Sequence, residues 1–398
     1  MPDFHKLDSS IPVAPISFIV MDSAKELGEL VNNHLVNFRH GLHSLPDDPA
    51  FQGYVRDDYR IKFSTPRFGS GESKATIGES IRGKDVFILT DVMNHSLSYK
   101  MFGYDNYYSP DDHYQDLKRV IAAINGKARR INIIMPFLYE GRQHHKNNRE
   151  SLDAAVMLRE LYDMGISNFV TFDAHDPRIS NSAPLAGFDN FMASPQFMKA
   201  LISNISDLTV DKDHLTVISP DEGALDRAVY FANVLGVDTG MFYKRRDYSK
   251  VVNGSNPIVA HEYLGSEIEG KDVIIIDDMI SSGSSMIDTA RQLKMKGAKR
   301  VFICTTFGLF TNGMEKFDKG YEEGDFDAVI TTNLIYQNPE YTNRPYYIVA
   351  DMSKFLATII DFMNHDDSLT NVITPTEKLH SILEKYNNGT RKTEELFD

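Results

Sequence analysis

Short runs of β-branched and aromatic residues alternate along the chain with longer segments whose apolar residues recur every three or four positions. The short runs predict buried strands, and the longer segments predict amphipathic helices. This alternation is typical of an α/β fold in which helices flank a mostly parallel sheet. The predicted strands are 16–21, 86–89, 131–135, 169–172, 215–218, 273–276 and 301–305. The predicted helices are 24–38, 114–124, 151–161, 225–235 and 286–295.

Two polar stretches interrupt the alternation, and the end of the chain departs from it. Residues 40–58 contain a Pro-Asp-Asp-Pro cluster, and residues 94–112 are rich in Tyr, Asn and Asp, so both are predicted to be surface insertions. From residue 366 to residue 398 the composition turns polar, which predicts a tail whose last residues fray.

One segment of the chain is repeated. Residues 83–91 read Gly-Lys-Asp-Val-Phe-Ile-Leu-Thr-Asp, and residues 270–278 read Gly-Lys-Asp-Val-Ile-Ile-Ile-Asp-Asp. The repeat favours two similar α/β domains. Chance is the alternative, because a Gly-Lys-Asp turn before a buried strand is ordinary in α/β proteins.

Composition narrows the classes of function. The 42 Lys and Arg residues against 56 Asp and Glu residues give a net charge of −14, so we expect neither nucleic acid nor a membrane as a partner. The sequence lacks the roughly 18 to 20 consecutive apolar residues of a membrane span, and its start lacks the order of a signal peptide. We therefore expect a soluble, cytoplasmic protein. The single cysteine, Cys304, lies in an apolar run and is predicted to be a buried, inert thiol.

The strongest candidate for chemistry follows the predicted strand 273–276. Asp277 and Asp278 come directly after it, and the Ser/Gly segment 281–285 opens the next helix. Free backbone N–H groups at a helix start, together with small residues and hydroxyls, suit a phosphomonoester. The two acids suit sugar hydroxyls or a hydrated Mg²⁺. The alternative is an ordinary helix start that Ser281 or Ser282 caps.

Further polar and charged residues follow other predicted strands. Asp173 and His175 come after strand 169–172, and Asp221 comes after strand 215–218, so these residues are candidates for a metal site or for turn hydrogen bonds. The basic run 244–246 is a candidate for phosphate chemistry or a solvated surface. Arg142 and Gln143 begin another polar loop, in which the adjacent His144 and His145 fit a solvated loop better than metal ligation.

Taken together, these segments resemble a known family. The segment 277–285 resembles the phosphoribosyl-diphosphate loop of the type I phosphoribosyltransferase fold, and the other motifs, in order from 13 to 361, resemble those of ribose-phosphate pyrophosphokinases. The resemblance implies an α/β fold with two phosphoribosyltransferase-like domains. We expect an N-terminal domain at 13–192 with the two insertions, a C-terminal domain at 193–345, a closing strand and helix at 346–365, and the tail at 366–398.

The resemblance also implies roles for residues. The implied reaction transfers the diphosphoryl group of MgATP to the 1-hydroxyl of ribose 5-phosphate, giving 5-phosphoribosyl 1-diphosphate and AMP. Mg²⁺ would be held by His175 and Asp221, and Lys244 and Arg246 would act on the transition state from the start of a mobile catalytic loop. The implied ATP-binding residues are Arg142 and Gln143, with Ser70, Gly71 and Glu72 reaching adenine from a neighbouring subunit, which requires at least a homodimer. The implied ribose-5-phosphate-binding residues are Asp277, Asp278, Ser281, Ser282, Gly283, Ser284 and Ser285.

This sequence departs from the family pattern at two of these positions, and two other functions remain open. Ser281 and Ser70 stand where the family usually carries acids. A phosphoribosyltransferase of the same fold is one alternative, and a catalytically inactive paralogue that regulates an active partner is the other.

Overall fold

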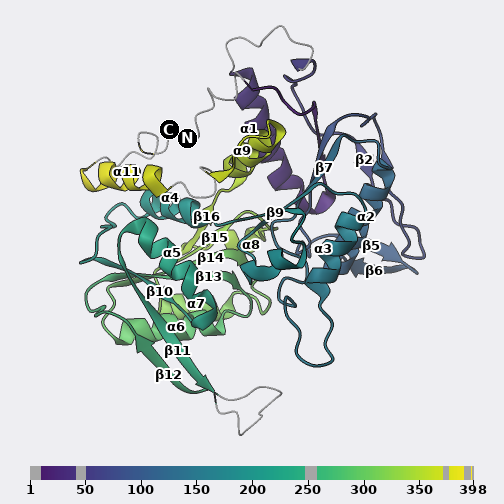
Figure 1. Cartoon of the computed structure of the whole chain (residues 1–398). Helices are drawn as coiled ribbons and strands as arrows, with labels where there is room; N and C mark the ends of the chain where they lie inside the picture. The colour runs from purple at the N-terminus through teal and green to yellow at the C-terminus, as the bar shows by residue number, and fades with distance from the viewer. Residues whose placement is uncertain (1–9, 42–50, 247–257, 371–375, 390–395, 397–398) are drawn as a thin grey trace. The chain divides into compact units, whose positions relative to one another are not determined.

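The computed structural model of the chain describes residues 10–41, 51–246, 258–370, 376–389 and 396 (Figure 1). Its contacts divide the chain into two compact units. The first unit comprises Met1–Ala193, Asn333–Tyr336 and Asp351–Thr374. The second comprises Ser194–Thr332, Gln337–Ala350 and Pro375–Asp398.

Within the described residues, five parallel strands form the sheet of the first unit. Four of them are almost wholly buried, as expected for parallel strands covered on both faces, whereas the edge strand Gly187–Phe191 is only partly buried. In sheet order they are β1 (Ile16–Val20), β4 (Asp85–Leu89), β7 (Arg130–Ile134), β8 (Asn168–Phe172) and β9 (Gly187–Phe191). The long helices of this unit are α1 (Lys25–His40), α2 (Pro110–Ile124), α3 (Asp153–Asp163) and α9 (Ser353–Asn364).

The sheet of the second unit has seven strands among the residues described. Its strands are parallel except for the edge strand β12, which runs antiparallel to β11. The sheet order is β12 (Ile258–Leu264), β11 (Asp238–Arg246), β10 (Leu215–Ser219), β13 (Asp272–Ile280), β14 (Arg300–Gly308), β15 (Ala328–Thr332) and β16 (Tyr347–Ala350). The helices are α4 (Ser194–Asn204), α5 (Leu225–Leu235), α6 (Ser284–Met295), α7 (Glu315–Glu322), α8 (Pro339–Thr342) and α11 (Thr376–Asn387).

The two units repeat one plan, which confirms the two similar domains predicted from the repeated segment. The order β1-β4-β7-β8-β9 matches the order β10-β13-β14-β15-β16. Both repeated strands also start with the same partly buried ion pair. Arg130 donates to both carboxylate oxygens of Asp85 at 2.9 and 2.8 Å, and Arg300 donates to both oxygens of Asp272 at 2.9 and 2.6 Å. Such a bidentate pair fixes the register of neighbouring strands at the base of the sheet.

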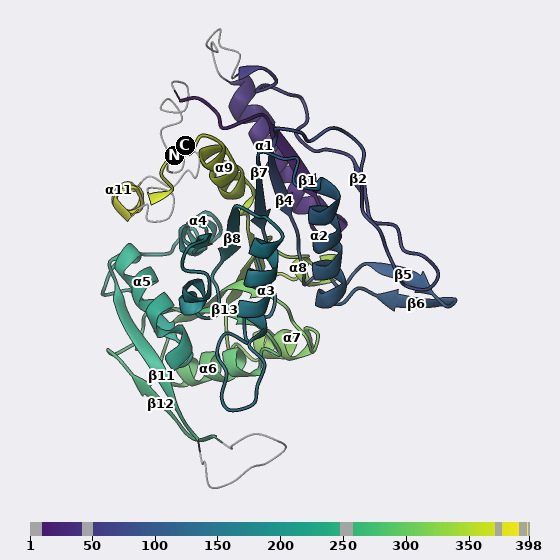
Figure 2. The same ribbon diagram turned by 45° about the vertical axis from the view of Figure 1, so that its right-hand side comes forward.

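The closing segment 346–365 is divided between the two units. Strand β16 completes the second sheet, where it pairs with β15. Helix α9 belongs to the first unit, where Phe355 packs at right angles to Phe191. Figures 1 and 2 both show α9 beside α1, the helix that follows β1.

The two predicted insertions differ in structure. The second, 94–112, contains an exposed hairpin of β5 (Ser98–Met101) and β6 (Tyr104–Tyr107), as expected for a surface insertion. In the first, residues 42–50 lie outside the described part of the chain. Phe51 and Tyr54, near the end of this stretch, are buried, and their rings pack edge to face. The Tyr54 ring also lies under the guanidinium of Arg39 on α1, and its hydroxyl bonds to His365 at 2.8 Å.

The polar tail contains a helix that the sequence analysis did not predict. Residues 376–387 form α11, and Leu379, Ile382, Leu383 and Tyr386 are buried along one side of it. The Tyr386 hydroxyl donates to the carbonyl oxygen of Leu208, 2.8 Å away in the second unit. These four apolar residues have helical spacing, which the polar residues between them conceal.

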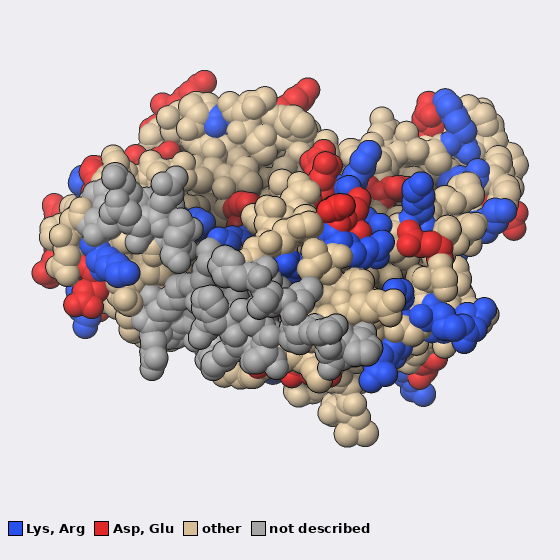
Figure 3. All heavy atoms as spheres, turned by 90° about the horizontal axis from the view of Figure 1, so that it is seen from above, with Lys and Arg blue, Asp and Glu red and all other residues tan. Residues whose placement is uncertain are grey.

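Acidic and basic side chains are interspersed on the face of the molecule seen in Figure 3. The net charge of −14 is therefore not gathered into one acidic surface on that face. Among the residues that the structure describes, no helix has both the length and the apolar character needed to cross a bilayer.

Candidate functional site

The predicted phosphate loop lies between β13 and α6 in the second unit. Gly283 precedes α6 with φ of 78°, in the left-handed region that glycine adopts without strain. A Cβ at this position would also collide with the ring of Phe317. Among the described residues no side chain caps this helix start, so the alternative in which Ser281 or Ser282 is the cap is not what the structure has. The first backbone N–H groups of α6 thus have no side-chain acceptor and suit an anion.

Asp277 and Asp278 lie near the end of β13, immediately before this loop. Asp278 is almost fully buried, and the Asp277 carboxylate accepts a hydrogen bond of 2.9 Å from the Asp278 backbone N–H. Burial raises the pKa of Asp277 well above its usual range, and the negative charges of Asp278 and Asp221 raise it further. Carboxylates crowded in this way favour a ligand that brings a cation or donates hydroxyl protons.

Two other residues of the second unit complete this acidic group. Asp221 follows β10, and its carboxylate accepts a 3.0 Å hydrogen bond from the backbone N–H of Gly223. The guanidinium of Arg227, on the first turn of α5, lies 3.5 Å from the carboxylate of Asp277 and offsets part of its charge. Sequence reasoning missed Arg227. The available signal was a cation four residues after Gly223, which lies in the turn that follows β10, on a helix that is otherwise largely apolar.

The predicted catalytic residues Lys244 and Arg246 lie in strand β11. Its backbone pairs with β12, with Lys244 opposite His261. The segment in which the predicted catalytic loop continues, residues 247–257, lies outside the described residues.

In the first unit, His175 follows β8 by a tight turn. Asp173 has φ of 44° and its backbone N–H donates to the carbonyl oxygen of Phe191 at 2.7 Å, which turns the chain so that His175 is exposed. The imidazole of His175 lies 5.6 Å from that of His144, measured between ring centroids. His144 in turn lies 3.3 Å from the carboxylate of Asp176, whose pKa the Arg178 hydrogen bond lowers to about 2.

His144 thereby brings the predicted ATP-binding residues Arg142 and Gln143 next to the turn of His175. Gln143 is fixed by two hydrogen bonds from its amide nitrogen, 3.1 Å to the carbonyl of His145 and 2.9 Å to that of Ser151. Arg142 is exposed, and its guanidinium forms no ion pair with another described residue. The sequence predicts that Arg142 and Gln143 lie on a loop, but it could not predict the contact of His144 with His175 and Asp176, because these residues are about 30 positions apart.

The predicted adenine loop, Ser70 to Glu72, connects β2 (Phe63–Ser64) and β3 (Thr76–Ile77). The Ser70 hydroxyl donates to the Glu72 carboxylate at 2.9 Å, and the Phe102 N–H donates to the carbonyl of Gly69, also at 2.9 Å. The inserted hairpin therefore supports this loop, a role that its sequence did not reveal. Arg67 strengthens the contact, because its guanidinium lies over the rings of Tyr99 and Tyr108.

Mg²⁺ fits these residues as part of a nucleotide complex rather than in a preformed cage. No three His, Cys, Asp or Glu side chains in the described part of the chain are grouped so that they could hold a metal. His175 belongs to the first unit and Asp221 to the second. Mg²⁺ is commonly bound by one or two protein groups together with substrate phosphates and water, which matches the acidic character at Asp221, Asp277 and Asp278.

Cys304 is fully buried in β14, as the sequence predicts. Burial raises the pKa of its thiol, so a thiolate nucleophile is excluded at this position.

Comparisons with known proteins agree with this geometry. Residues 16–165 match the model of the N-terminal domain of ribose phosphate pyrophosphokinase, and residues 188–342 match the phosphoribosyl transferase domain. A ribose-phosphate pyrophosphokinase of Staphylococcus saprophyticus is 30% identical over 324 residues, covering 79% of this chain and 92% of the relative. One of Staphylococcus aureus is 29% identical over 312 residues, covering 77% and 88%.

A solved structure is similar as well. The phosphoribosylpyrophosphate synthetase of Mycobacterium smegmatis superposes with a TM-score of 0.67 and 24% identity, covering 88% of this chain and 99% of that one, which supports the shared fold. Because both domain models match in order and the relatives align over nearly their whole length, the chain belongs to the ribose-phosphate pyrophosphokinase family.

Proposed function

We propose that the two units divide the substrates of this family's reaction, with ribose 5-phosphate held by the second unit and the nucleotide contacted from the first. As a family member the protein is a ribose-phosphate diphosphokinase, which transfers the diphosphoryl group of ATP to the 1-hydroxyl of ribose 5-phosphate and releases AMP. The observation that carries the assignment is the Asp277–Asp278 pair, of which Asp278 is buried and Asp277 half-buried, shortly before an uncapped helix start.

The second unit supplies the sugar site. The backbone N–H groups and hydroxyls of Ser281, Ser282, Gly283, Ser284 and Ser285 hold the 5-phosphate. Asp277 and Asp278 accept hydrogen bonds from the ribose hydroxyls, which offset the burial and the mutual repulsion that raise the pKa of Asp277. Arg227 keeps the Asp277 carboxylate oriented toward the sugar.

The first unit supplies the nucleotide contacts. Arg142 and Gln143 bind ATP beside His175, and Ser70, Gly71 and Glu72 reach the adenine of a neighbouring subunit. The protein is therefore at least a homodimer, and it acts in the cytoplasm. His175 and Asp221 would hold the Mg²⁺ of the nucleotide, and that ion would supply positive charge against the phosphates.

Catalysis in this proposal depends on position and charge. The 1-hydroxyl attacks the β-phosphorus in line with the departing AMP, so negative charge develops on the transferred group and on the leaving α-phosphate. Lys244 and Arg246 stabilise that charge in the transition state. No protein nucleophile takes part, in keeping with the buried thiol of Cys304.

One coupled assay tests the proposal. We expect AMP to form from ATP only when both Mg²⁺ and ribose 5-phosphate are present, with one 5-phosphoribosyl 1-diphosphate formed per AMP. A purine or pyrimidine base as the required second substrate would instead identify a phosphoribosyltransferase. Absence of turnover alone, with stimulation of an active relative, would identify a regulatory paralogue.

A further inference from the structure

A lysine from a neighbouring helix reaches the loop that we assign to the sugar phosphate. The ammonium of Lys316, the second residue of α7, donates a 2.7 Å hydrogen bond to the hydroxyl of Ser284, the first residue of α6. Ser284 is one of the five residues assigned to the 5-phosphate. The cation therefore lies one hydroxyl away from the proposed phosphate position. Nothing in the local sequence around Lys316 indicated this contact.

The position of Lys316 is fixed by packing that does not depend on the ammonium group. The next residue, Phe317, is fully buried, and its ring fills the space over Gly283. The same ring packs edge to face against Phe310, on the loop that follows β14. In that loop the Thr311 N–H donates to the carbonyl of Ser281 at 3.0 Å. Helix α7 is thus attached to both ends of the predicted phosphate loop.

The charge of Lys316 is not neutralised by a nearby acid. Within the part of the chain that the structure describes, Lys316 forms no ion pair, and Asp318 on the same helix is bonded to Arg344 at 2.6 Å. A sugar phosphate carries about −1.5 to −2 charges near pH 7, and the start of a helix supplies only about half a positive charge. The nearby carboxylates of Asp277 and Asp278 oppose an anion. A full positive charge beside Ser284 compensates for this opposition.

We propose that Lys316 is a ribose-5-phosphate-binding residue, which contacts a 5-phosphate oxygen together with Ser284 and gives the enzyme its preference for a phosphorylated sugar over free ribose. The proposal rests on the function proposed above. It adds a side chain that the loop residues alone do not provide, because none of the residues 281–285 is a cation.

Steady-state kinetics of Lys316→Met test the proposal, with Lys319→Met as the matched control. Lys319 lies on the same helix, is 73% exposed and pairs with Glu323 at 3.6 Å. We expect Lys316→Met to raise the KM for ribose 5-phosphate about fivefold to tenfold, the range for loss of one partly exposed charged contact. The KM for MgATP and kcat should change by less than about twofold. Lys316→Arg should restore most of the affinity.

Inorganic phosphate gives a second readout that needs no turnover by the sugar. As a competitor of ribose 5-phosphate, it should bind Lys316→Met several-fold more weakly than the parent and bind Lys319→Met equally well. An unchanged KM for ribose 5-phosphate, or equal rises in both KM values, would overturn the role of Lys316. A parent enzyme that forms no AMP with ribose 5-phosphate would instead overturn the proposed function itself.

Discussion

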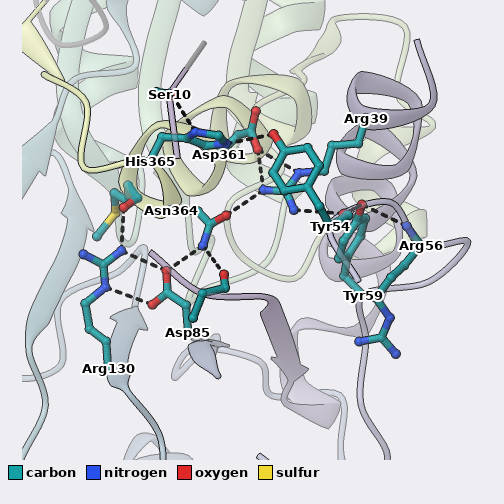
Figure 4. Close-up of polar contacts among 12 residues, drawn as sticks. Ser10, Arg39, Tyr54, Arg56, Tyr59, Asp85, Arg130, Asp361, Asn364 and His365 are labelled. Atoms are coloured by element: carbon teal, nitrogen blue, oxygen red, sulfur yellow. Dashed lines mark hydrogen bonds and ion pairs between the residues drawn. The ribbon is translucent and has the colours of Figure 1, made fainter. Parts of the chain in front are cut away.

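The ion pair between Arg39 and Asp361 offers a quantitative test of what holds α9 against α1 (Figure 4). Two nitrogens of the Arg39 guanidinium donate to the same carboxylate oxygen of Asp361, Nη2 at 2.6 Å and Nε at 3.0 Å. The side chains are 1% and 3% exposed. Arg39 also donates to the side chain of Asn364 at 2.9 Å and to the carbonyl of Tyr54 at 3.2 Å. The pair thus joins two helices that are more than 300 residues apart in sequence.

We expect Asp361→Asn to destabilise the first unit by about 3 to 5 kcal/mol, because it leaves the guanidinium buried without an anion. The cost comes from the uncompensated charge rather than from the loss of a favourable pair. The double variant Arg39→Met/Asp361→Leu removes both charges and should therefore recover most of the loss. A surface pair supplies the control. Asp58 and Arg60 are 48% and 36% exposed, so Asp58→Asn should cost less than about 1 kcal/mol.

Hydrogen exchange read peptide by peptide is the suitable assay, because the chain has two units and no tryptophan. Protection should fall in the peptides of α1 and α9 and stay unchanged in those of α5 and α6. Added salt should weaken the effect of Asp58→Asn and leave that of Asp361→Asn nearly unchanged. A loss for Asp361→Asn no larger than that of the surface control would refute the reasoning, as would a double variant less stable than the single one.

Three further outcomes are expected. Asp277→Asn should raise the melting temperature of the ligand-free protein near neutral pH and lower turnover. Burial raises the pKa of Asp277, so ionising this carboxyl costs stability once the pH exceeds the ordinary pKa of an aspartate. Calorimetry measures the first effect and the AMP assay the second. Burial lowers the pKa of His365, whose ring bonds to Ser10 and Tyr54. The stability of the first unit should therefore be full above pH ~6.5 and fall below it, where the unfolded histidine takes up a proton more readily than the folded one. Melting curves of His365→Gln should show a shallower fall with decreasing pH. Lys244→Ala should lower kcat by orders of magnitude while ribose 5-phosphate still binds. Mixing Lys244→Ala subunits with Glu72→Ala subunits should restore some activity, because one shared site would then carry both original residues. Single-turnover rates near those of the parent would contradict the role of Lys244, and no complementation would contradict the shared site.

Periodicity in the sequence predicted most of the elements because it depends on local burial. The helix expected at 225–235 is α5, and the seven predicted strands all form, with ends that differ by a few residues. The exception at α11 has a physical cause. Its four buried residues are separated by charged and polar ones, so the average composition of the segment concealed the apolar face that packs on the second unit.

Residues that act through distant partners were the ones that the sequence could not supply. Lys316 stands among Glu315, Asp318 and Lys319, a run that reads as a solvated helix face, and only the packing of Phe317 on Gly283 turns it toward the phosphate loop. Arg227 likewise depends on the pairing of β10 with β13, which brings the start of α5 to the end of β13. Such contacts are set by sheet order, which local patterns do not encode.

The repeated strand explains how one plan serves different purposes in the two units. At its start both copies keep the same element, Asp85 with Arg130 and Asp272 with Arg300, because each sheet needs that register. At its end the copies diverge. Where the second unit has Asp277, the first has Thr90, whose hydroxyl is buried and has no hydrogen-bond partner among the described residues. Asp91, the counterpart of Asp278, accepts hydrogen bonds from the backbone N–H groups of Met93 and Tyr336 at 2.8 and 2.6 Å. Both oxygens of Asp91 therefore hold the chain. The first unit thus uses for structure a position that our proposal assigns to ribose binding in the second, where the Asp278 carboxylate also accepts a 2.9 Å hydrogen bond from the Met279 N–H.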